Sequence, residues 1–315
     1  MKHLFVINPI AGKGKGFDII MPKIKESLSG RDIDYEIYVS GSPEDTVSYT
    51  REWAGRGDPV RVYACGGDGT LYNVINGVYG YENAEFAAVP LGSGNDFVRF
   101  FGTKEGFTDI DAQIDGTAVK IDGIRCGDHV AINQCSMGMD AEVCAKQRDF
   151  KKLPFLSGES AYTASLLYCL KNKRQNRFTI TIDDGEPIEK DVLFAFCGNS
   201  RFYGGGYMAG PFAVPDDGLL DFSVIETMKL PRLLREINNY KAGRHYKWKE
   251  TTYLRGKRMT VRSEKQAAVN IDGECEFATE CTFEVLPGAF NFVIPTTSSY
   301  IEDRRSGRIS DKIGV

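Results

Sequence analysis

The sequence predicts an N-terminal α/β domain with a doubly wound, mostly parallel sheet, followed by a C-terminal antiparallel β-sandwich. In the first third of the chain, strand and helix patterns alternate, as they do where helical crossovers join parallel strands. Beyond residue 117, β-rich runs follow one another across tight turns, which is typical of antiparallel pairing. A length of 315 residues allows two domains, each with its own core.

In the first part of the chain, four expected strands alternate with three expected helices. The strands are expected at residues 4–7, 35–39, 60–65 and 86–90. The helices are expected at residues 17–28, 43–54 and 70–78. Apolar spacing indicates the first and third helices, and Ser42 followed by Pro43 and two acidic residues forms a start signal for the second.

In the second part, two hairpins and further strands are expected. Residues 119–125 and 129–135 flank a Cys-Gly-Asp turn, and residues 178–182 and 192–197 flank an Asp-Asp-Gly turn. More strands are expected at residues 220–225, 259–261, 267–271, 281–286 and 290–294. Two helices are expected to interrupt these strands, at residues 160–172 and 231–241.

The predicted boundaries give an α/β domain over residues 1–122 and a β-rich domain over residues 123–294. The tail, residues 295–315, is charged and Ser-rich, and either is disordered or packs back on the first domain. A formal net charge of -4 with 26% charged residues does not suggest a nucleic-acid binder. No apolar run approaches the roughly 18 to 20 residues of a membrane span, and residues 4–7 are too short for a signal peptide. We therefore expect a cytoplasmic protein.

The eight cysteines are scattered through the sequence. No Cys-x-x-Cys pair occurs, and the chain has only three histidines, which argues against a zinc site. Several cysteines lie in apolar runs such as residues 192–197, where a reduced cysteine acts as a small core residue. We therefore expect all eight to be structural.

Three glycine-rich turns directly follow strands of the first domain, at residues 8–16, 66–70 and 91–96. The carboxyl ends of strands in an open parallel sheet face one crevice, so these turns are expected to converge there. Glycine lets backbone amides approach phosphate oxygens, helix N-termini add a positive dipole, and Lys13 or Lys15 can add charge. The turns therefore predict a polyphosphate site, although neither the Walker A nor the Rossmann glycine pattern is present.

Asp68 is the clearest candidate for chemistry within these turns. It lies between glycines at the end of an apolar strand, a poor position for core packing but a good one for accepting an Mg²⁺ ion bound to phosphates. The alternative is a helix N-cap for residues 70–78, a role that Asp68 could fill at the same time.

Further motifs follow these turns in order along the chain. The first half contains Asn-Pro-x-Ala-Gly at residues 8–12, Gly-Gly-Asp-Gly-Thr at 66–70 and Pro-Leu-Gly-Ser-Gly-Asn-Asp-Phe at 90–97. The second half contains Gly-Gly-Gly-Tyr-Met-Ala-Gly-Pro at residues 204–211, Pro-Asp-Asp-Gly-Leu-Leu-Asp at 215–221 and Asp-Gly-Glu at 272–274. Together they resemble the diacylglycerol kinase catalytic domain family, which includes bacterial lipid kinases and sphingosine and ceramide kinases. The resemblance implies a first domain of the NAD kinase and phosphofructokinase type.

The resemblance implies which residues contact the donor, ATP. They are Asn8, Pro9, Ile10, Ala11, Gly12, Lys15, Ser40, Gly66, Gly67, Asp68, Gly69, Thr70, Ser93 and Asn95. Ala11 stands where serine is frequent and Ser93 where threonine is frequent, but each remains a small residue.

The resemblance also implies the catalytic pair, Asp68 and Glu274. Glu274 matches the general base that takes the proton of the acceptor hydroxyl as this attacks the γ-phosphate, a contribution of about 10² to 10⁴-fold. The alternative for Glu274 is a solvated turn residue.

A structural Mg²⁺ ion in the second domain is implied in the same way. Asp217 matches its carboxylate ligand, and the backbone carbonyls of Val214 and Leu219 would assist. Without the resemblance, residues 216–218 would indicate only a turn.

The implied acceptor is a lipid, with diacylglycerol favoured over a sphingoid base, ceramide or another glyceride or polyprenyl alcohol. Residues 229–258 hold ten basic and two acidic residues, a local charge of ten minus two, +8. Such a segment can attract anionic headgroups by about 1 kcal/mol per basic residue, and it predicts peripheral association with the inner face of the membrane. A solvated basic face is the alternative, and homodimer formation is left open.

Two other functions compete with a lipid kinase. NAD kinases share the Gly-Gly-Asp-Gly loop, but they carry a later Asn-Glu or Asn-Asp pair, and the pair Asn95 and Asp96 already belongs to the lipid kinase motif. A non-catalytic nucleotide-binding protein would have no chemical need for both Asp68 and Glu274.

Overall fold

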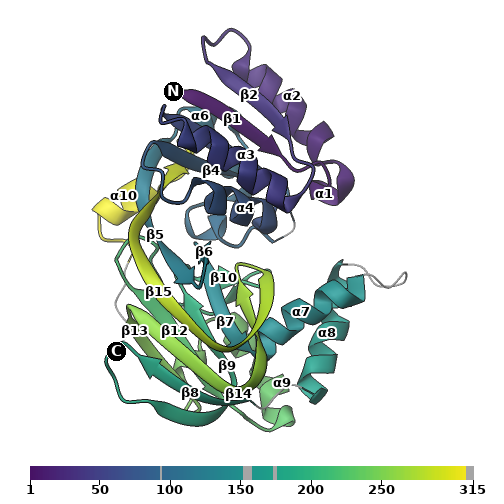
Figure 1. Ribbon diagram of the computed structural model, residues 1–315, viewed down its shortest axis with the longest axis vertical. Coiled ribbons are helices and arrows are strands. Elements are labelled where there is room, and N and C mark those ends of the chain that lie inside the picture. The colour runs from purple at the N-terminus through teal and green to yellow at the C-terminus, as the bar shows by residue number, and fades with distance from the viewer. Residues whose placement is uncertain (93, 152–157, 173–175, 310–315) are drawn as a thin grey trace.

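The computed structural model describes residues 1–92, 94–151, 158–172 and 176–309 (Figure 1). In Figure 1 the N-terminal α/β half lies at the top and the β-rich half at the bottom. Two helices of the lower half, α7 (Met139–Lys151) and α8 (Gly158–Asn172), project to one side.

The N-terminal half is a parallel sheet with helices on both faces. Its strands, in the spatial order β4-β3-β1-β2, are β4 (Ala84–Pro90), β3 (Val60–Gly66), β1 (Lys2–Ile7) and β2 (Tyr35–Val39). Apolar residues of α2 (Gly16–Leu28) and α6 (Ile110–Ile114) cover one face. Those of α3 (Pro43–Gly55) and α4 (Asp68–Val78) cover the other. The doubly wound arrangement is confirmed.

The C-terminal half pairs its strands antiparallel, as predicted. They are β5 (Thr117–Cys126), β6 (His129–Ala131), β7 (Gln134–Gly138), β8 (Asn176–Ile182), β9 (Ile188–Gly198), β12 (Leu220–Glu226), β13 (Thr251–Gly256), β14 (Arg258–Ile271) and β15 (Glu274–Ile294). Both predicted hairpins are present, β5–β6 and β8–β9. A separate short hairpin joins β10 (Phe202–Tyr203) to β11 (Tyr207–Met208).

The strand β15 links the two halves. It pairs with β14 and β5 along most of its 21 residues, and near its end Asn291 and Phe292 pair in parallel with β4. One hydrogen-bonded network therefore runs from β13 to β2. The predicted domain boundary between residues 122 and 123 falls inside β5, and it stays a prediction.

The helices of the C-terminal half differ from the expectation in number. The two expected helices correspond to α8 and α9 (Leu230–Lys241), but α7 is an additional one. Met139 and Val143 are among the few large apolar residues of α7, so its periodic signal is weak. The N-terminal half also contains short helical segments. The helix α1 (Ala11–Gly14) follows β1, and the 3₁₀ turn η1 (Val98–Phe100) and the helix α5 (Lys104–Phe107) follow β4.

The tail returns to the N-terminal half. In α10 (Tyr300–Arg305), the buried ring of Tyr300 packs against Phe100 and Phe101. The final part of the predicted tail, residues 310–315, lies outside the described residues. No helix in the described ranges is long and apolar enough to cross a membrane.

Candidate active site

The three glycine-rich loops meet at the carboxyl edge of the parallel sheet. The Asn8 side-chain amide donates to Thr70 Oγ1 at 3.0 Å, joining the first loop to the second. The Asn95 backbone N–H donates to Asp68 Oδ2 at 2.9 Å, joining the third loop to the second. A Cβ atom on Gly92 would lie 2.9 Å from the Cα atom of Gly67, so only glycine permits this approach. The predicted convergence is confirmed.

The first loop is an exposed turn that begins where β1 ends. The Ile10 N–H donates to Asn8 Oδ1 at 3.1 Å, and Gly12 has a positive φ of 59°. Ser40, after β2, donates its N–H to the Ile7 carbonyl at 3.0 Å, which places it beside this turn. Lys15 is exposed. The turn, Ser40 and Lys15 thus border the same edge of the sheet, whereas Ser93 lies outside the described residues.

Asp68 is the first residue of α4, not its N-cap. The N-cap is Gly67, so the alternative role predicted for Asp68 is wrong, and its carboxylate accepts from Asn95 instead. Solvent reaches Asp68, but the surrounding protein partly desolvates it and raises its pKa, with a smaller contribution from the charge of Asp96. A cation beside this carboxylate would therefore be favourable.

The turn between β14 and β15 is fixed by Asp272. Its carboxylate accepts backbone hydrogen bonds from Ile132 at 2.7 Å, Asn133 at 3.2 Å and Gln134 at 2.7 Å. Burial raises the pKa of Asp272 to about 6, and the charge of Asp68 adds to this rise. The turn of the C-terminal half and the Asp68 loop of the N-terminal half are therefore within electrostatic reach of each other.

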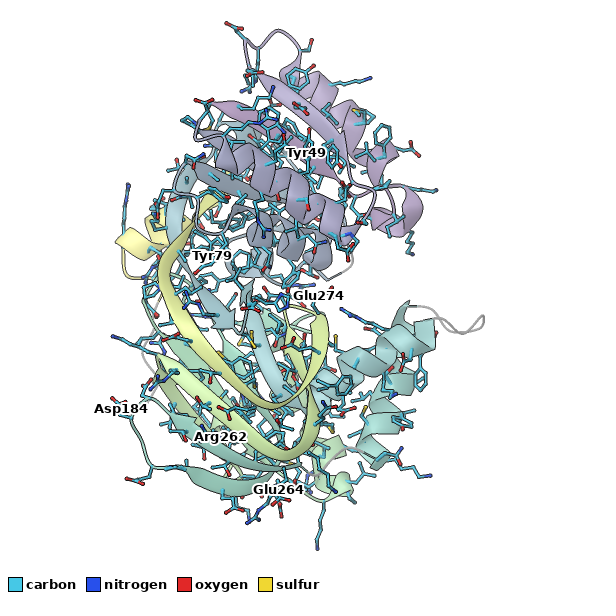
Figure 2. The ribbon with its side chains drawn as sticks, viewed as in Figure 1. Tyr49, Tyr79, Asp184, Arg262, Glu264 and Glu274 are labelled. Atoms are coloured by element: carbon cyan, nitrogen blue, oxygen red, sulfur yellow. The ribbon has the colours of Figure 1, made fainter. Side chains whose placement is uncertain are left out.

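Glu274 follows this turn and lies between the two halves of the molecule (Figure 2). Its carboxylate forms an ion pair with Arg148 of α7, and the two side chains are 46% and 44% exposed. Arg148 also donates to the Gly273 carbonyl at 3.1 Å. The sequence analysis missed Arg148 because it missed the helix that carries it.

The third loop also contacts the glycine triplet of the C-terminal half. Asp96 Oδ2 accepts from the Gly205 N–H at 2.6 Å, and Asp96 Oδ1 lies 3.1 Å from Arg99 Nε. Beside these residues is a cavity of about 450 Å³, whose lining includes Arg99, Lys104 and Gly206. The lining also includes Glu105, Val98 and Phe202, so it combines both signs of charge with apolar side chains.

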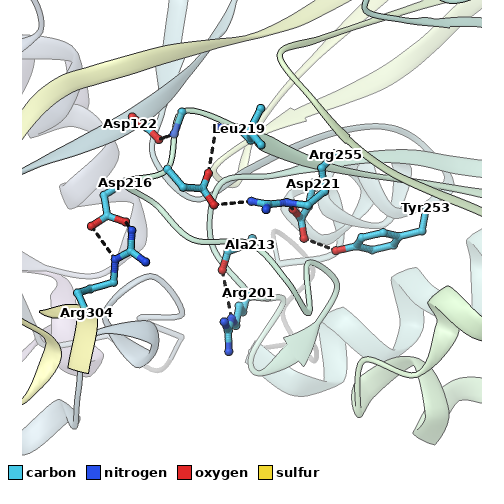
Figure 3. A network of polar contacts seen from close by, with 11 residues as sticks. Asp122, Arg201, Ala213, Asp216, Leu219, Asp221, Tyr253, Arg255 and Arg304 are labelled. Carbon is cyan, nitrogen blue, oxygen red and sulfur yellow. Dashed lines mark hydrogen bonds and ion pairs between the residues drawn. The ribbon is translucent and has the colours of Figure 1, made fainter. Parts of the chain in front are cut away.

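Asp217 and Leu219 of the predicted structural metal site belong to a different polar network, part of which Figure 3 shows. Asp217 Oδ1 accepts from the Leu219 N–H at 3.0 Å, and Asp217 Oδ2 accepts from Arg255. Arg255 also donates to Asp221 at 2.7 Å. Val214 is buried.

The loop that carries Asp217 is held by several further contacts. Asp122 accepts from Gly218 at 2.7 Å and from Gly288 at 2.7 Å. Asp216 forms an ion pair with Arg304 of α10 at 2.7 Å (Figure 3). Burial raises the pKa of Asp122, and the negative charges of Asp217 and Asp216 add to this rise. The sequence analysis did not assign Asp122, Arg255 or Arg304 to any site.

The arrangement around Asp217 does not suit a bound Mg²⁺ ion. Mg²⁺ requires near-octahedral oxygen ligands, but both carboxylate oxygens of Asp217 already accept hydrogen bonds, one of them from a guanidinium. A cation would have to displace Arg255 or lie beside its positive charge. The metal set Val214, Asp217 and Leu219 remains a prediction that this geometry disfavours.

Two family descriptions match the sequence. Residues 2–126 match "Diacylglycerol kinase catalytic domain", and residues 133–294 match "YegS C-terminal NAD kinase beta sandwich-like domain". A Shewanella frigidimarina protein named "Probable lipid kinase YegS-like" is 30% identical over 90% of this chain and 91% of its own length. A "Diacylglycerol kinase" of Mycobacterium tuberculosis is 27% identical over 91% of this chain and 93% of its own length.

Solved structures agree with this fold. A diacylglycerol kinase from Bacillus anthracis superposes with a TM-score of 0.67 at 20% identity, covering 94% of this chain and 97% of the other. An NAD kinase from Archaeoglobus fulgidus in complex with ATP gives a TM-score of 0.51 at 15% identity, with both chains covered completely. At these identities the similarity supports the fold alone, an α/β domain joined to a β-sandwich-like domain.

Proposed function

We propose, for a chain that belongs to the diacylglycerol kinase catalytic domain family, that the acceptor is the hydroxyl of diacylglycerol and the product phosphatidic acid. Family membership makes the chain a lipid kinase that uses ATP. The choice of diacylglycerol rests on the similarity to a "Diacylglycerol kinase" over 91% of this chain, and the position of Glu274 between the two halves supports transfer from a donor site to an acceptor site. In this proposal the donor site belongs to residues 1–122 and the acceptor site to residues 123–294.

On the donor side, the interlocked loops would bind the phosphates of ATP. The Gly66–Thr70 loop and the N-terminus of α4 lie at the carboxyl edge of the sheet, and the backbone N–H groups of glycine-rich loops and helix N-termini favour phosphate oxygens. Asn8, Ser40 and Lys15 border this edge and would complete the site.

Asp68 would hold the Mg²⁺ ion that accompanies ATP. Its carboxylate is solvent-accessible, and its surroundings raise its pKa, so a hard cation would stabilise the ionised form. When bound, Mg²⁺ would neutralise charge on the phosphates. Asp68 would hold the ion in position, because the hydrogen bond from the Asn95 backbone N–H keeps its carboxylate in place.

On the acceptor side, Glu274 would take the proton of the lipid hydroxyl as its oxygen attacks the γ-phosphate. For this, the carboxylate must come within hydrogen-bond reach of the hydroxyl. Glu274 is about half exposed and pairs with Arg148, a contact that contributes little when solvated. We therefore infer that Glu274 leaves Arg148, or shares it with the acceptor, when the lipid binds.

The enzyme would reach its acceptor by peripheral association with an anionic membrane surface. The basic segment, residues 229–258, presents exposed cations around and after α9: Lys229, Arg235, Lys241, Arg244, Lys247, Lys249, Lys257 and Arg258. Arg232 pairs with Glu250, and Arg255 is directed inward, so the effective charge is smaller than the sequence implies. Homodimer formation stays a prediction.

An acceptor panel tests the proposed function. Purified protein, Mg²⁺ and labelled ATP would be offered diacylglycerol, sphingosine, ceramide and NAD in mixed micelles. We expect label in phosphatidic acid. Label in another lipid would change the acceptor but keep the lipid kinase, whereas label in NADP alone would contradict both.

A further inference from the structure

Two of the eight cysteines differ from the other six in their surroundings. The six buried cysteines are Cys65, Cys126, Cys135, Cys169, Cys197 and Cys281. Cys144 on α7 and Cys275 at the start of β15 are partly exposed. These two are therefore less deeply buried than the other six, and the expectation that all eight are structural stays a prediction.

The two thiols lie side by side between α7 and the β14–β15 turn. The Cys144 thiol donates to the Gly273 carbonyl at 3.2 Å, and the Cys275 thiol donates to the Ala141 carbonyl at 3.8 Å. Each thiol thus contacts the backbone of the segment that carries the other cysteine. The two thiols also shift each other's pKa, that of Cys144 downward and that of Cys275 upward, as expected for sulfur atoms that lie close together.

We propose that a hydroperoxide converts Cys144 and Cys275 into a reversible disulfide bond and that this bond switches off phosphate transfer. The formation of the disulfide stands on the cysteine geometry alone. The loss of transfer rests on the proposed function, because it depends on Glu274 acting as the base.

The thiolate of Cys144 attacks one peroxide oxygen, the O–O bond breaks, and the other oxygen leaves as an alcohol or water after protonation. Cys144 is then a sulfenic acid. The Cys275 sulfur attacks it, the S–S bond forms, and the S–O bond breaks to release water with the Cys275 proton. Two electrons pass from the two thiols to the peroxide. A dithiol reductant reverses the reaction by thiol–disulfide exchange.

The surroundings select Cys144 as the attacking group. The neighbouring Cys275 thiol lowers the pKa of Cys144, and the Arg148 charge one turn later on α7 also lowers it, against the opposing effects of burial, Asp140 and Glu274. The Cys144 thiol in turn raises the pKa of Cys275. Since the thiolate is the reactive form, Cys144 reacts first and Cys275 resolves the product.

The bond would act on Glu274 through the backbone. Cys275 is the next residue after Glu274, and Arg148, which holds the Glu274 carboxylate, lies on the same helix as Cys144. A disulfide would therefore fix the turn against α7 and keep Glu274 at Arg148. The base could then not reach the acceptor hydroxyl.

The test treats the reduced full-length chain with hydrogen peroxide and follows both the peptide map and phosphate transfer. We expect one non-reduced peptide pair that joins Cys144 to Cys275, while the six buried cysteines stay reduced. On complete oxidation transfer should fall by about 10² to 10⁴-fold, as expected when a general base is withdrawn, and return with dithiothreitol. Cys144→Ser is the matched control, because its hydroxyl can keep the contact with Gly273. It should transfer phosphate normally and resist peroxide.

Three results would overturn the proposal. They are the absence of the joined peptide pair, its presence with unchanged transfer, and equal peroxide inactivation of Cys144→Ser. If the reduced protein phosphorylates no lipid, the proposed function fails, and the peptide map alone then decides whether the disulfide forms.

Discussion

Two arginine–carboxylate pairs hold loops of the C-terminal half, and they differ in their contact with water. The side chains of Arg255, Asp217 and Asp221 are 11%, 8% and 0% exposed, whereas those of Arg148 and Glu274 are 44% and 46% exposed. Breaking a buried pair leaves a charge without solvent or partner, but an exposed pair contributes only a small free energy.

This difference in exposure distinguishes an ion pair that stabilises the fold from an ion pair whose partners can separate. The Arg255 pair fixes the loop that contains Asp217, and it has no reason to open during a reaction. The Arg148 pair holds Glu274 beside the boundary of the two halves at little cost in free energy. The comparison therefore favours a structural role for the Asp217 loop and agrees with the catalytic role that we propose for Glu274.

The largest expected effect on stability comes from breaking the buried pair. Arg255→Met would leave Asp217 and Asp221 without their cation, and we expect the free energy of unfolding to fall by about 3–5 kcal/mol. Urea unfolding measures this change. The exposed neighbour Lys257 offers a matched control, since Lys257→Met should stay within about 0.5 kcal/mol of the wild type. Equal stability of the two variants would remove the structural role of Arg255.

A smaller effect is expected for the exposed pair. Arg148→Ala should lower the free energy of unfolding by less than about 1 kcal/mol, because both partners are solvated. Turnover should change less than it does when Glu274 itself is replaced, since the base remains. If the free energy of unfolding measured in urea fell by several kcal/mol, the distinction between the exposed pair and the buried pair would be wrong.

The smallest effect is expected on removing divalent metal from the nucleotide-free protein. If Arg255 supplies the positive charge at Asp217, a chelator should shift Tm by less than about 1 °C, which corresponds to a fraction of a kcal/mol. Differential scanning calorimetry with and without the chelator measures this shift. If the chelator lowers Tm by several degrees and added Mg²⁺ reverses this change, the Asp217 loop binds a metal ion after all.

Much of the fold could be predicted because local patterns specify it. Ser42 caps α3 by accepting from Asp45, as the start signal indicates, and buried apolar runs mark β1, β3 and β4. The pattern failed for α7, whose contacts are made by scattered residues. It also failed to join residues 259–261 and 267–271 into β14, where the ladder has an irregularity.

The candidate site was predictable where backbone geometry demands a residue type. A Cβ atom on Gly92 would lie too close to Gly67, so the glycine pattern marks the loops that meet at this edge of the sheet. Arg148 and Arg255 carry no such mark, because their roles depend on pairing across 126 and 38 residues of sequence. The motif points to Asp217, but it does not predict that the guanidinium of Arg255 donates a hydrogen bond to this carboxylate.

The most direct test of the account is turnover by Glu274→Gln. The substitution keeps the size of the side chain but removes the carboxylate that would accept the proton. We expect kcat for diacylglycerol phosphorylation to fall by about 10² to 10⁴-fold, with ATP affinity and the free energy of unfolding close to wild type. An unchanged kcat would contradict the account, because Glu274 would then be only a solvated partner of Arg148.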